Sequence, residues 1–143
     1  MDYEVIDDLT RADVAVRVKG SSYDELFIKG GRALLCEMVE NHGDISGEVE
    51  KSGTLSAAAI DLLFFEFLNE IIFFKDAESL LLLPEAVKIT AGEGGYSCVF
   101  KLKGERIDRG RHIFRADVKA VTMHGLRVFE NNGSYLAEVL FDV

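Results

Sequence analysis

The sequence of 143 residues contains no tryptophan, one proline and two cysteines. Cys36 and Cys98 lie far apart without a CxxC spacing, which argues against a disulfide scaffold and favours two free, buried thiols in a reducing compartment. The three histidines form no i,i+4 pair and no Cys/His ligand spacing, so a zinc site is not expected. Because 48% of the residues are hydrophobic, the apolar core alone is expected to stabilise the fold.

Motifs for phosphate binding and for nucleophilic catalysis are also missing. The one glycine-rich stretch, Gly92 to Gly95, lies between two predicted strands, so no helix N-terminus follows it to bind a phosphate. There is no nucleophile-elbow pattern, although a Ser/His/Asp triad assembled by the fold stays open. These absences disfavour a nucleotide-binding enzyme and give a hydrolase little support.

Positive charge is scarce as well. The chain has 16 Lys plus Arg against 25 Asp plus Glu, which gives a net charge of −9. An average field of this sign repels polyanions, so strong direct binding of nucleic acid is not expected. It suits basic partner proteins, or divalent cations bound by a few carboxylates.

No long uninterrupted apolar run is present. The most apolar stretch, residues 55–74, carries Asp61, Glu66 and Glu70, which is the pattern of a buried amphipathic helix and not of a membrane span. The first residues do not resemble a signal peptide. We therefore expect a soluble, cytoplasmic protein with no membrane partner.

Apolar periodicity predicts two helices within a series of strands. The first helix begins at Tyr23, where Ser22 and Glu25 form a capping box, and the second runs from about Ser56 to about Phe74. Alternating or apolar segments predict strands over residues 3–6, 13–19, 45–54, 80–83, 87–90, 96–103, 115–123, 126–130 and 135–141, with Pro84 limiting pairing and Asn132-Gly133 favouring a hairpin. This order predicts one layered α+β domain over residues 1–143, with a mostly antiparallel β-sheet packed with two α-helices.

Three aspartates occupy unusual places in the predicted strands. Asp13 opens a strand, Asp117 lies inside another, and Asp142 is the penultimate residue. Aspartate is depleted in strands, so two interpretations stay open: solvated edge positions, or ligands for a hard cation. The α-carboxylate of Val143 lies beside Asp142 in the sequence, and Asp13 brought alongside would complete a set of three oxygen donors.

Four segments of the sequence together resemble the archease family: residues 12–14 leading into a strand and a capped helix, residues 62–73, residues 118–126, and the ending Phe141-Asp142-Val143. The resemblance covers nearly the whole chain. It implies a small, non-enzymatic activator of an RtcB-type RNA ligase in tRNA splicing and RNA repair, one that promotes ligase guanylylation and multiple turnover through a metal-binding carboxylate cluster. The alternative function is a chaperone-like modulator of tRNA-modifying enzymes such as tRNA methyltransferases.

The resemblance also implies site residues. Metal binding falls on Asp13, Asp142 and the terminal carboxylate of Val143, with calcium as the first candidate cation and magnesium or manganese as alternatives. Activation or partner binding falls on Glu25, Asp117, Lys119 and His124. Structural roles stay open for three of these: helix capping for Glu25, edge protection for Lys119 and a bend for His124. The other histidines, His42 and His112, are expected to be exposed.

Overall fold

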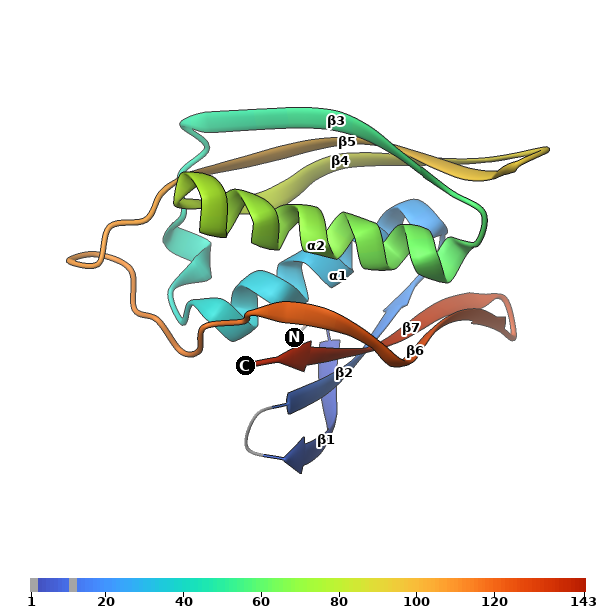
Figure 1. Cartoon of the computed structure of the whole chain (residues 1–143), viewed down its shortest axis with the longest axis horizontal. Coiled ribbons are helices and arrows are strands. Elements are labelled where there is room, and N and C mark those ends of the chain that lie inside the picture. Colours follow the sequence, from blue (N-terminus) through green and yellow to red (C-terminus); the bar gives the residue numbers. More distant parts are fainter. Residues whose placement is uncertain (1–2, 11–12) are drawn as a thin grey trace.

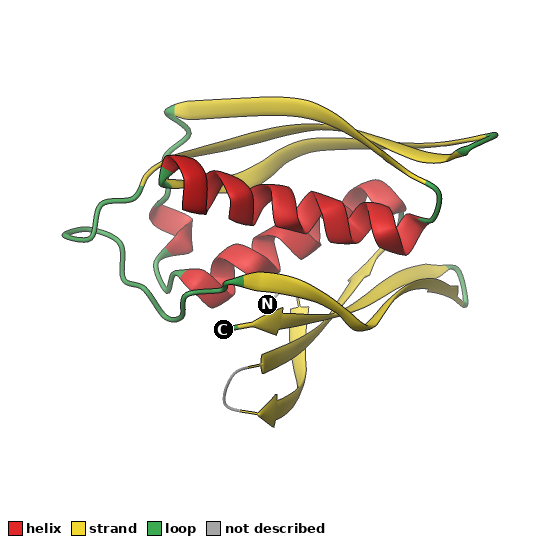
Figure 2. Cartoon of the chain, viewed as in Figure 1, coloured by secondary structure: helices red, strands yellow, loops and turns green. Residues whose placement is uncertain are grey.

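The computed structural model describes residues 3–10 and 13–143 of the chain. Within these residues two α-helices lie between two antiparallel sheets, which gives three layers (Figure 1). The elements are, in chain order, β1 (Tyr3–Thr10), β2 (Asp13–Gly20), α1 (Tyr23–Met38), a 3-10 turn (His42–Asp44), β3 (Val49–Ala57), α2 (Ile60–Glu78), β4 (Leu80–Gly92), β5 (Gly95–Arg106), β6 (Ala120–Asn131) and β7 (Ser134–Asp142). The predicted fold class is confirmed, and the strands divide between two sheets (Figure 2).

The first sheet brings the two ends of the chain together. Its strand order is β1-β2-β7-β6, and β2 pairs with β7 along its whole length, beginning with Asp13 opposite Asp142. β6 and β7 form the predicted hairpin, in which Asn132 and Gly133 have φ angles of 54° and 80°. These left-handed conformations are the ones that an Asn-Gly hairpin turn requires.

The second sheet has the order β3-β5-β4 and covers the other side of the helices. The prediction that Pro84 limits pairing is confirmed only locally: the β4–β5 register shifts between Pro84 and Ala86, but β4 continues through Pro84, which lies opposite Leu102. β4 is an edge strand, and an edge strand tolerates a residue that lacks a backbone N–H.

Aromatic side chains fill the space between the sheets. Phe27 of α1 packs against Phe64 and Phe67 of α2 at ring-centroid distances of 5.1 and 5.4 Å, and Phe67 contacts Phe100 of β5 at 5.9 Å. All four rings are buried. Gly30 permits this approach, because a Cβ atom there would lie 2.7 Å from the Phe64 ring.

The second helix begins later than predicted. α2 spans Ile60–Glu78 and not residues 56–74, because the chain remains in β3 as far as Ala57. The strand predicted over residues 45–54 is shifted in the same direction, to Val49–Ala57. No side chain caps the N-terminus of α2, so the sequence offered no polar signal for its first residue.

The prediction of two free, buried thiols holds for one of the two cysteines. Neither Cys36 nor Cys98 forms a disulfide, and Cys98 is buried, but Cys36 is half-buried. Burial raises the pKa of the Cys98 thiol to about 12. Across residues 3–10 and 13–143, the structure contains no helix of the length and apolar character that a membrane crossing needs.

Candidate functional site

Asp13 and Asp142 face each other across the middle of the first sheet, at the point where β2 begins and β7 ends. They are register partners in adjacent antiparallel strands, so their side chains lie on the same face with Cβ atoms about 5 Å apart. The backbone N–H of Lys119 donates to the carbonyl oxygen of Asp142 over 2.8 Å, which attaches the start of β6 to the same place. The fold thus joins three segments that are far apart in the sequence.

The two carboxylates form a donor pair without a counter-charge. Both residues are half-buried, and within the part of the chain that the structure describes neither side chain has a hydrogen-bond or ion-pair partner. Like charges directly opposite each other in a sheet are unfavourable, and hard divalent cations bind such oxygen donors. No group of three or more His, Cys, Asp or Glu side chains converges among the described residues, so further donors have to come from elsewhere. Val143, predicted to supply its α-carboxylate, follows Asp142 and is half-buried.

Asp117 does not lie in a strand, so that part of the prediction is wrong. It belongs to the segment between β5 and β6, where its side chain accepts a hydrogen bond from Lys75 Nζ over 2.7 Å. Lys75 is buried at the end of α2 and also pairs with Asp76 at 2.8 Å. Burial opposes the charge of Lys75, but the bonds to Asp117 and Asp76 raise its pKa above the ordinary lysine value, and the bond from Lys75 holds the pKa of Asp117 below its usual range. Asp117 is therefore an ionised, surface-facing group (74% exposed) in a fixed position.

His124 lies on the outer edge of the first sheet, in an irregular part of β6. The β6–β7 register shifts between Thr122 and Arg127, and Gly125 has a φ of 69°. The N–H of His124 donates to Thr122 Oγ1 over 3.2 Å, and the side chain is exposed. This geometry agrees with a bend at His124, and it leaves the imidazole accessible to a partner.

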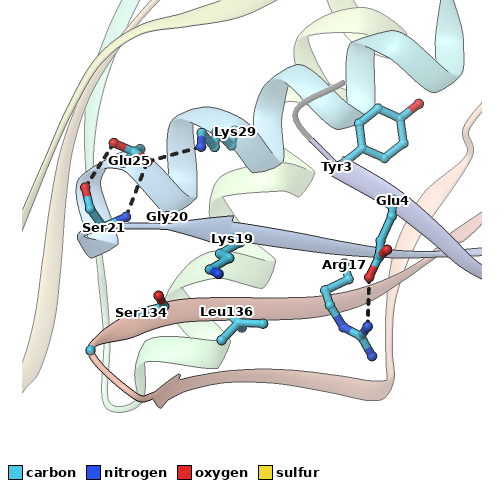
Figure 3. A pocket seen from close by; sticks show the side chains of 11 residues that line it. Tyr3, Glu4, Arg17, Lys19, Gly20, Ser21, Glu25, Lys29, Ser134 and Leu136 are labelled. Atoms are coloured by element: carbon cyan, nitrogen blue, oxygen red, sulfur yellow. Dashed lines mark hydrogen bonds and ion pairs between the residues drawn. The ribbon is translucent and has the colours of Figure 1, made fainter.

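Glu25 lies in a surface groove at the other end of β2. The groove has a volume of about 600 Å³ and lies between β1, β2, β7 and the start of α1 (Figure 3). The Ser22 hydroxyl caps α1 by accepting from the N–H of Glu25 over 3.1 Å, but the capping box is only half formed. The Glu25 carboxylate accepts instead from the N–H and the hydroxyl of Ser21 and pairs with Lys29, and the Lys29 contact lowers the pKa of Glu25.

The predicted site residues therefore fall in two places. β2 is eight residues long, so its ends are about 23 Å apart at roughly 3.3 Å per residue. Asp13, Asp142 and the backbone of Lys119 gather at one end, whereas Glu25 lies at the other. Glu25 is not a ligand of the carboxylate pair.

Several buried charged groups were not predicted from the sequence. Lys75 follows Leu68 by seven residues and Ile71 by four, a spacing that puts it on the buried side of α2 and could have drawn attention to it. Glu37 follows Leu34 by three residues in α1 in the same way, and it accepts a hydrogen bond from the Tyr3 hydroxyl. For these two residues the signal was a charge within an apolar stripe.

His112 is buried, so the prediction of an exposed side chain is wrong. Its Nδ1 accepts from the N–H of Asp108 over 2.8 Å, so Nε2 carries the proton and donates to Glu105 over 3.0 Å. Glu105 is only 2% exposed and also contacts Arg111 and the N–H of Ser46. Burial, with a smaller effect of Arg111, lowers the pKa of His112 below its ordinary value of 6.5.

This lowered pKa predicts a loss of stability in mild acid. Below about pH 6.5 the unfolded chain protonates its histidines while folded His112 resists, so the contribution of neutral His112 to stability is present above 6.5 and is lost as the pH falls toward its folded pKa. Urea unfolding at about pH 7.5 and about pH 5.5 should therefore show a smaller decrease for His112→Gln than for the wild type. The exposed His124→Gln is the control and should follow the wild type; an identical decrease in all three proteins would contradict the prediction.

The geometry defines a class of protein: a small, three-layer α+β domain with a pair of facing carboxylates where its second strand, β2, meets its last strand, β7. The model of the Archease protein family (MTH1598/TM1083) matches residues 3–143. The chain belongs to this family.

Individual relatives agree with the family match. The chain is 29% identical to the protein archease of Archaeoglobus fulgidus over 143 residues, which covers all of both chains. It is 28% identical to that of Methanopyrus kandleri, covering 92% of this chain and 94% of the relative.

Solved structures agree as well. The solution structure of Methanobacterium thermoautotrophicum protein 1598 superposes with a TM-score of 0.85 at 26% identity, covering 99% of both chains. A crystal structure described as an archease, possible chaperone, from Thermotoga maritima has a TM-score of 0.64 at 21% identity, covering 94% of this chain and 93% of that one. This second likeness supports the fold alone.

Proposed function

We propose that this protein is a non-enzymatic activator of an RtcB-type RNA ligase, promoting guanylylation of the ligase and its multiple turnover. The observation that carries the proposal is the register pair of Asp13 and Asp142, two uncompensated carboxylates from opposite ends of the chain. Metal binding by these two residues is what the resemblance to the family implies, and the chain belongs to that family. A small domain that presents two facing carboxylates at a sheet surface is suited to act on the metal or nucleotide site of another protein.

A divalent cation is the proposed ligand of the carboxylate pair. Asp13 and Asp142 would hold it together with the α-carboxylate of Val143, and calcium is the first candidate, with magnesium or manganese as alternatives. The donor set fits, because it consists of anionic oxygens that have no other partner among the described residues. When bound, the cation would supply positive charge for nucleotidyl transfer in the partner. The role of this chain's own residues is to hold the carboxylates opposite each other.

The surface around the pair is the proposed contact with the ligase. Asp117 and Lys119 precede β6, and His124 lies further along the same edge strand; all three are exposed. The net charge of −9 complements a positively charged, nucleotide-binding cleft. Glu25, beyond the other end of β2, would contact a different part of the partner or act only at the start of α1.

The decisive experiment measures guanylylation of a cognate ligase with GTP. Substoichiometric amounts of this protein should accelerate the reaction and restore multiple turnover of RNA joining, because an activator that is released can act on many ligase molecules. The protein alone should neither join RNA nor hydrolyse nucleotide. RNA joining by the isolated protein, or stimulation only at one-to-one ratios, would contradict the proposal.

A second candidate function is that of a chaperone-like modulator of tRNA-modifying enzymes such as tRNA methyltransferases, the alternative that the sequence resemblance implies. The Thermotoga maritima structure is described as a possible chaperone, and that description names no partner. Under this alternative the protein should raise the solubility or specificity of a methyltransferase, and Asp13→Asn should retain that effect. Loss of both effects in Asp13→Asn would assign them to one surface.

A further inference from the structure

The outer face of the β3-β5-β4 sheet is turned away from the helices (Figure 1). Register partners in a sheet share a face, so one row across this face contains Thr54, Val99 and Lys88. The next row contains Ser52, Lys101 and Ala86. Val99, in the centre, is 55% exposed, and both lysines are exposed.

These rows form a shallow hollow of about 650 Å³, lined by residues 52–54, 86–88 and 99–101. Its lining includes Lys88 and Lys101 and no carboxylate, although the chain as a whole carries a net charge of −9. Neither lysine has a carboxylate within 4 Å in the described chain, whereas the neighbouring Lys103 pairs with Glu85 at 3.5 Å. The lining of the hollow is therefore positively charged, and the carboxylates nearest to it on the same face, Glu50 and Glu85, lie in the neighbouring row with Lys103.

The hydroxyl groups on this face extend the row of hydrogen-bond donors. Ser52 and Thr54 line the hollow, and Ser56, Ser97 and Thr90 form the next row toward the β4–β5 turn. Ammonium and hydroxyl groups are the side-chain donors that bind phosphate oxygens. The outward residues of the three strands include no aromatic ring, so the face lacks both a stacking platform for bases and the aromatic anchors of strong protein interfaces.

We propose that this face binds the sugar-phosphate backbone of single-stranded RNA, without base specificity, through Lys88, Lys101 and the hydroxyls of Ser52 and Thr54. The inference rests on the proposed function in one respect: the RNA is the substrate of the partner ligase. Two lysines on an acidic domain give weak binding, which guides an RNA that the ligase already holds.

The test measures fluorescence anisotropy of a labelled single-stranded RNA of mixed sequence over a range of salt concentrations. Lys88→Gln combined with Lys101→Gln should weaken binding at low ionic strength by about fivefold or more and make the slope of log K against log salt shallower by about 1.4, at roughly 0.7 per phosphate contact. The control is Arg106→Gln combined with Arg127→Gln, which removes the same charge from other parts of the surface. The affinity for RNA and the salt slope should change much less in this control than in the Lys88/Lys101 double variant. Thermal unfolding of each variant checks that it is folded.

A second arm separates this inference from the proposed function. Guanylylation of the ligase in the absence of RNA should be equally stimulated by the wild type and by the Lys88/Lys101 double variant, while multiple-turnover RNA joining should decrease with the double variant. Equal RNA binding by the wild type and the double variant, or no binding at low salt, would overturn the inference even if stimulation is observed. If the double variant no longer stimulates guanylylation in the absence of RNA, the face contacts the ligase itself, and the inference is overturned as well. Absence of stimulation by the wild type would refute the proposed function, and the anisotropy result would still decide RNA binding.

Discussion

Asp13→Asn is expected to abolish activation of the ligase and binding of a divalent cation while leaving the fold intact. The substitution retains the size of the side chain and removes one of two facing charges. Cation affinity depends on the number and charge of the oxygen donors, so it should fall steeply. In metal-free buffer the free energy of unfolding should change by less than about 1 kcal/mol, and in the stabilising direction, because repulsion from Asp142 is relieved.

The measurement combines thermal unfolding, with and without calcium, and ligase guanylylation. Calcium should raise the melting temperature of the wild type, because it binds the folded state, and should not raise that of Asp13→Asn. Asp44→Asn, which removes one charge from the exposed 3-10 turn, is the matched control and should respond to calcium as the wild type does. Equal calcium stabilisation and equal activation in all three proteins would show that Asp13 only begins a strand.

Gly104→Ala is expected to destabilise the whole domain. Gly104 is buried in β5, and a Cβ atom at this position would lie 1.7 Å from the carbonyl oxygen of Leu81 in β4. The obstacle is backbone, which cannot move aside as a flexible side chain can, so β4 and β5 would have to separate. We expect the free energy of unfolding to fall by about 3 kcal/mol or more. Urea unfolding followed by circular dichroism measures this loss.

A control glycine distinguishes this clash from the general effect of replacing glycine by alanine. Gly43 lies in the exposed 3-10 turn, where an added Cβ atom would meet no other atom within 4 Å, so Gly43→Ala should be neutral or slightly stabilising. Activation by Gly104→Ala should fall only in proportion to its unfolded fraction, in contrast to Asp13→Asn. Wild-type stability of Gly104→Ala would contradict the close approach of β4 and β5.

Local signals in the sequence predicted the first half of the chain better than the second. The Val14, Val16 and Val18 alternation predicted β2, and Ser22 predicted the start of α1, because each signal lies within a few residues of the element that it determines. The start of α2 was predicted four residues early, since the apolar residues of α2 and the end of β3 are continuous and carry no capping side chain. Apolar periodicity cannot show where β3 ends and α2 begins in such a run.

Long-range partners were the main source of error. The strand around Asp117 was predicted from the alternation of apolar residues alone. In the structure this segment is not a strand, and the Asp117 side chain accepts a hydrogen bond from the buried Lys75 of α2. His112 was predicted to be exposed, but Glu105 and Asp108 bind it with hydrogen bonds in a buried position. A buried charge is tolerated only with a partner, and that partner cannot be identified from local sequence.

The sequence by itself determined the fold class and the hairpin at Asn132-Gly133, and it supplied the aspartates that we propose as cation ligands, because residue type, periodicity and turn chemistry are local properties. Tertiary structure alone decided which of these residues meet. Antiparallel pairing of β2 with β7 brings Asp13 opposite Asp142 and leaves Glu25 at the far end of the strand. The register of that pairing is fixed by the apolar residues that both strands bury against the helices, since a shift by one residue would turn each buried side chain toward solvent.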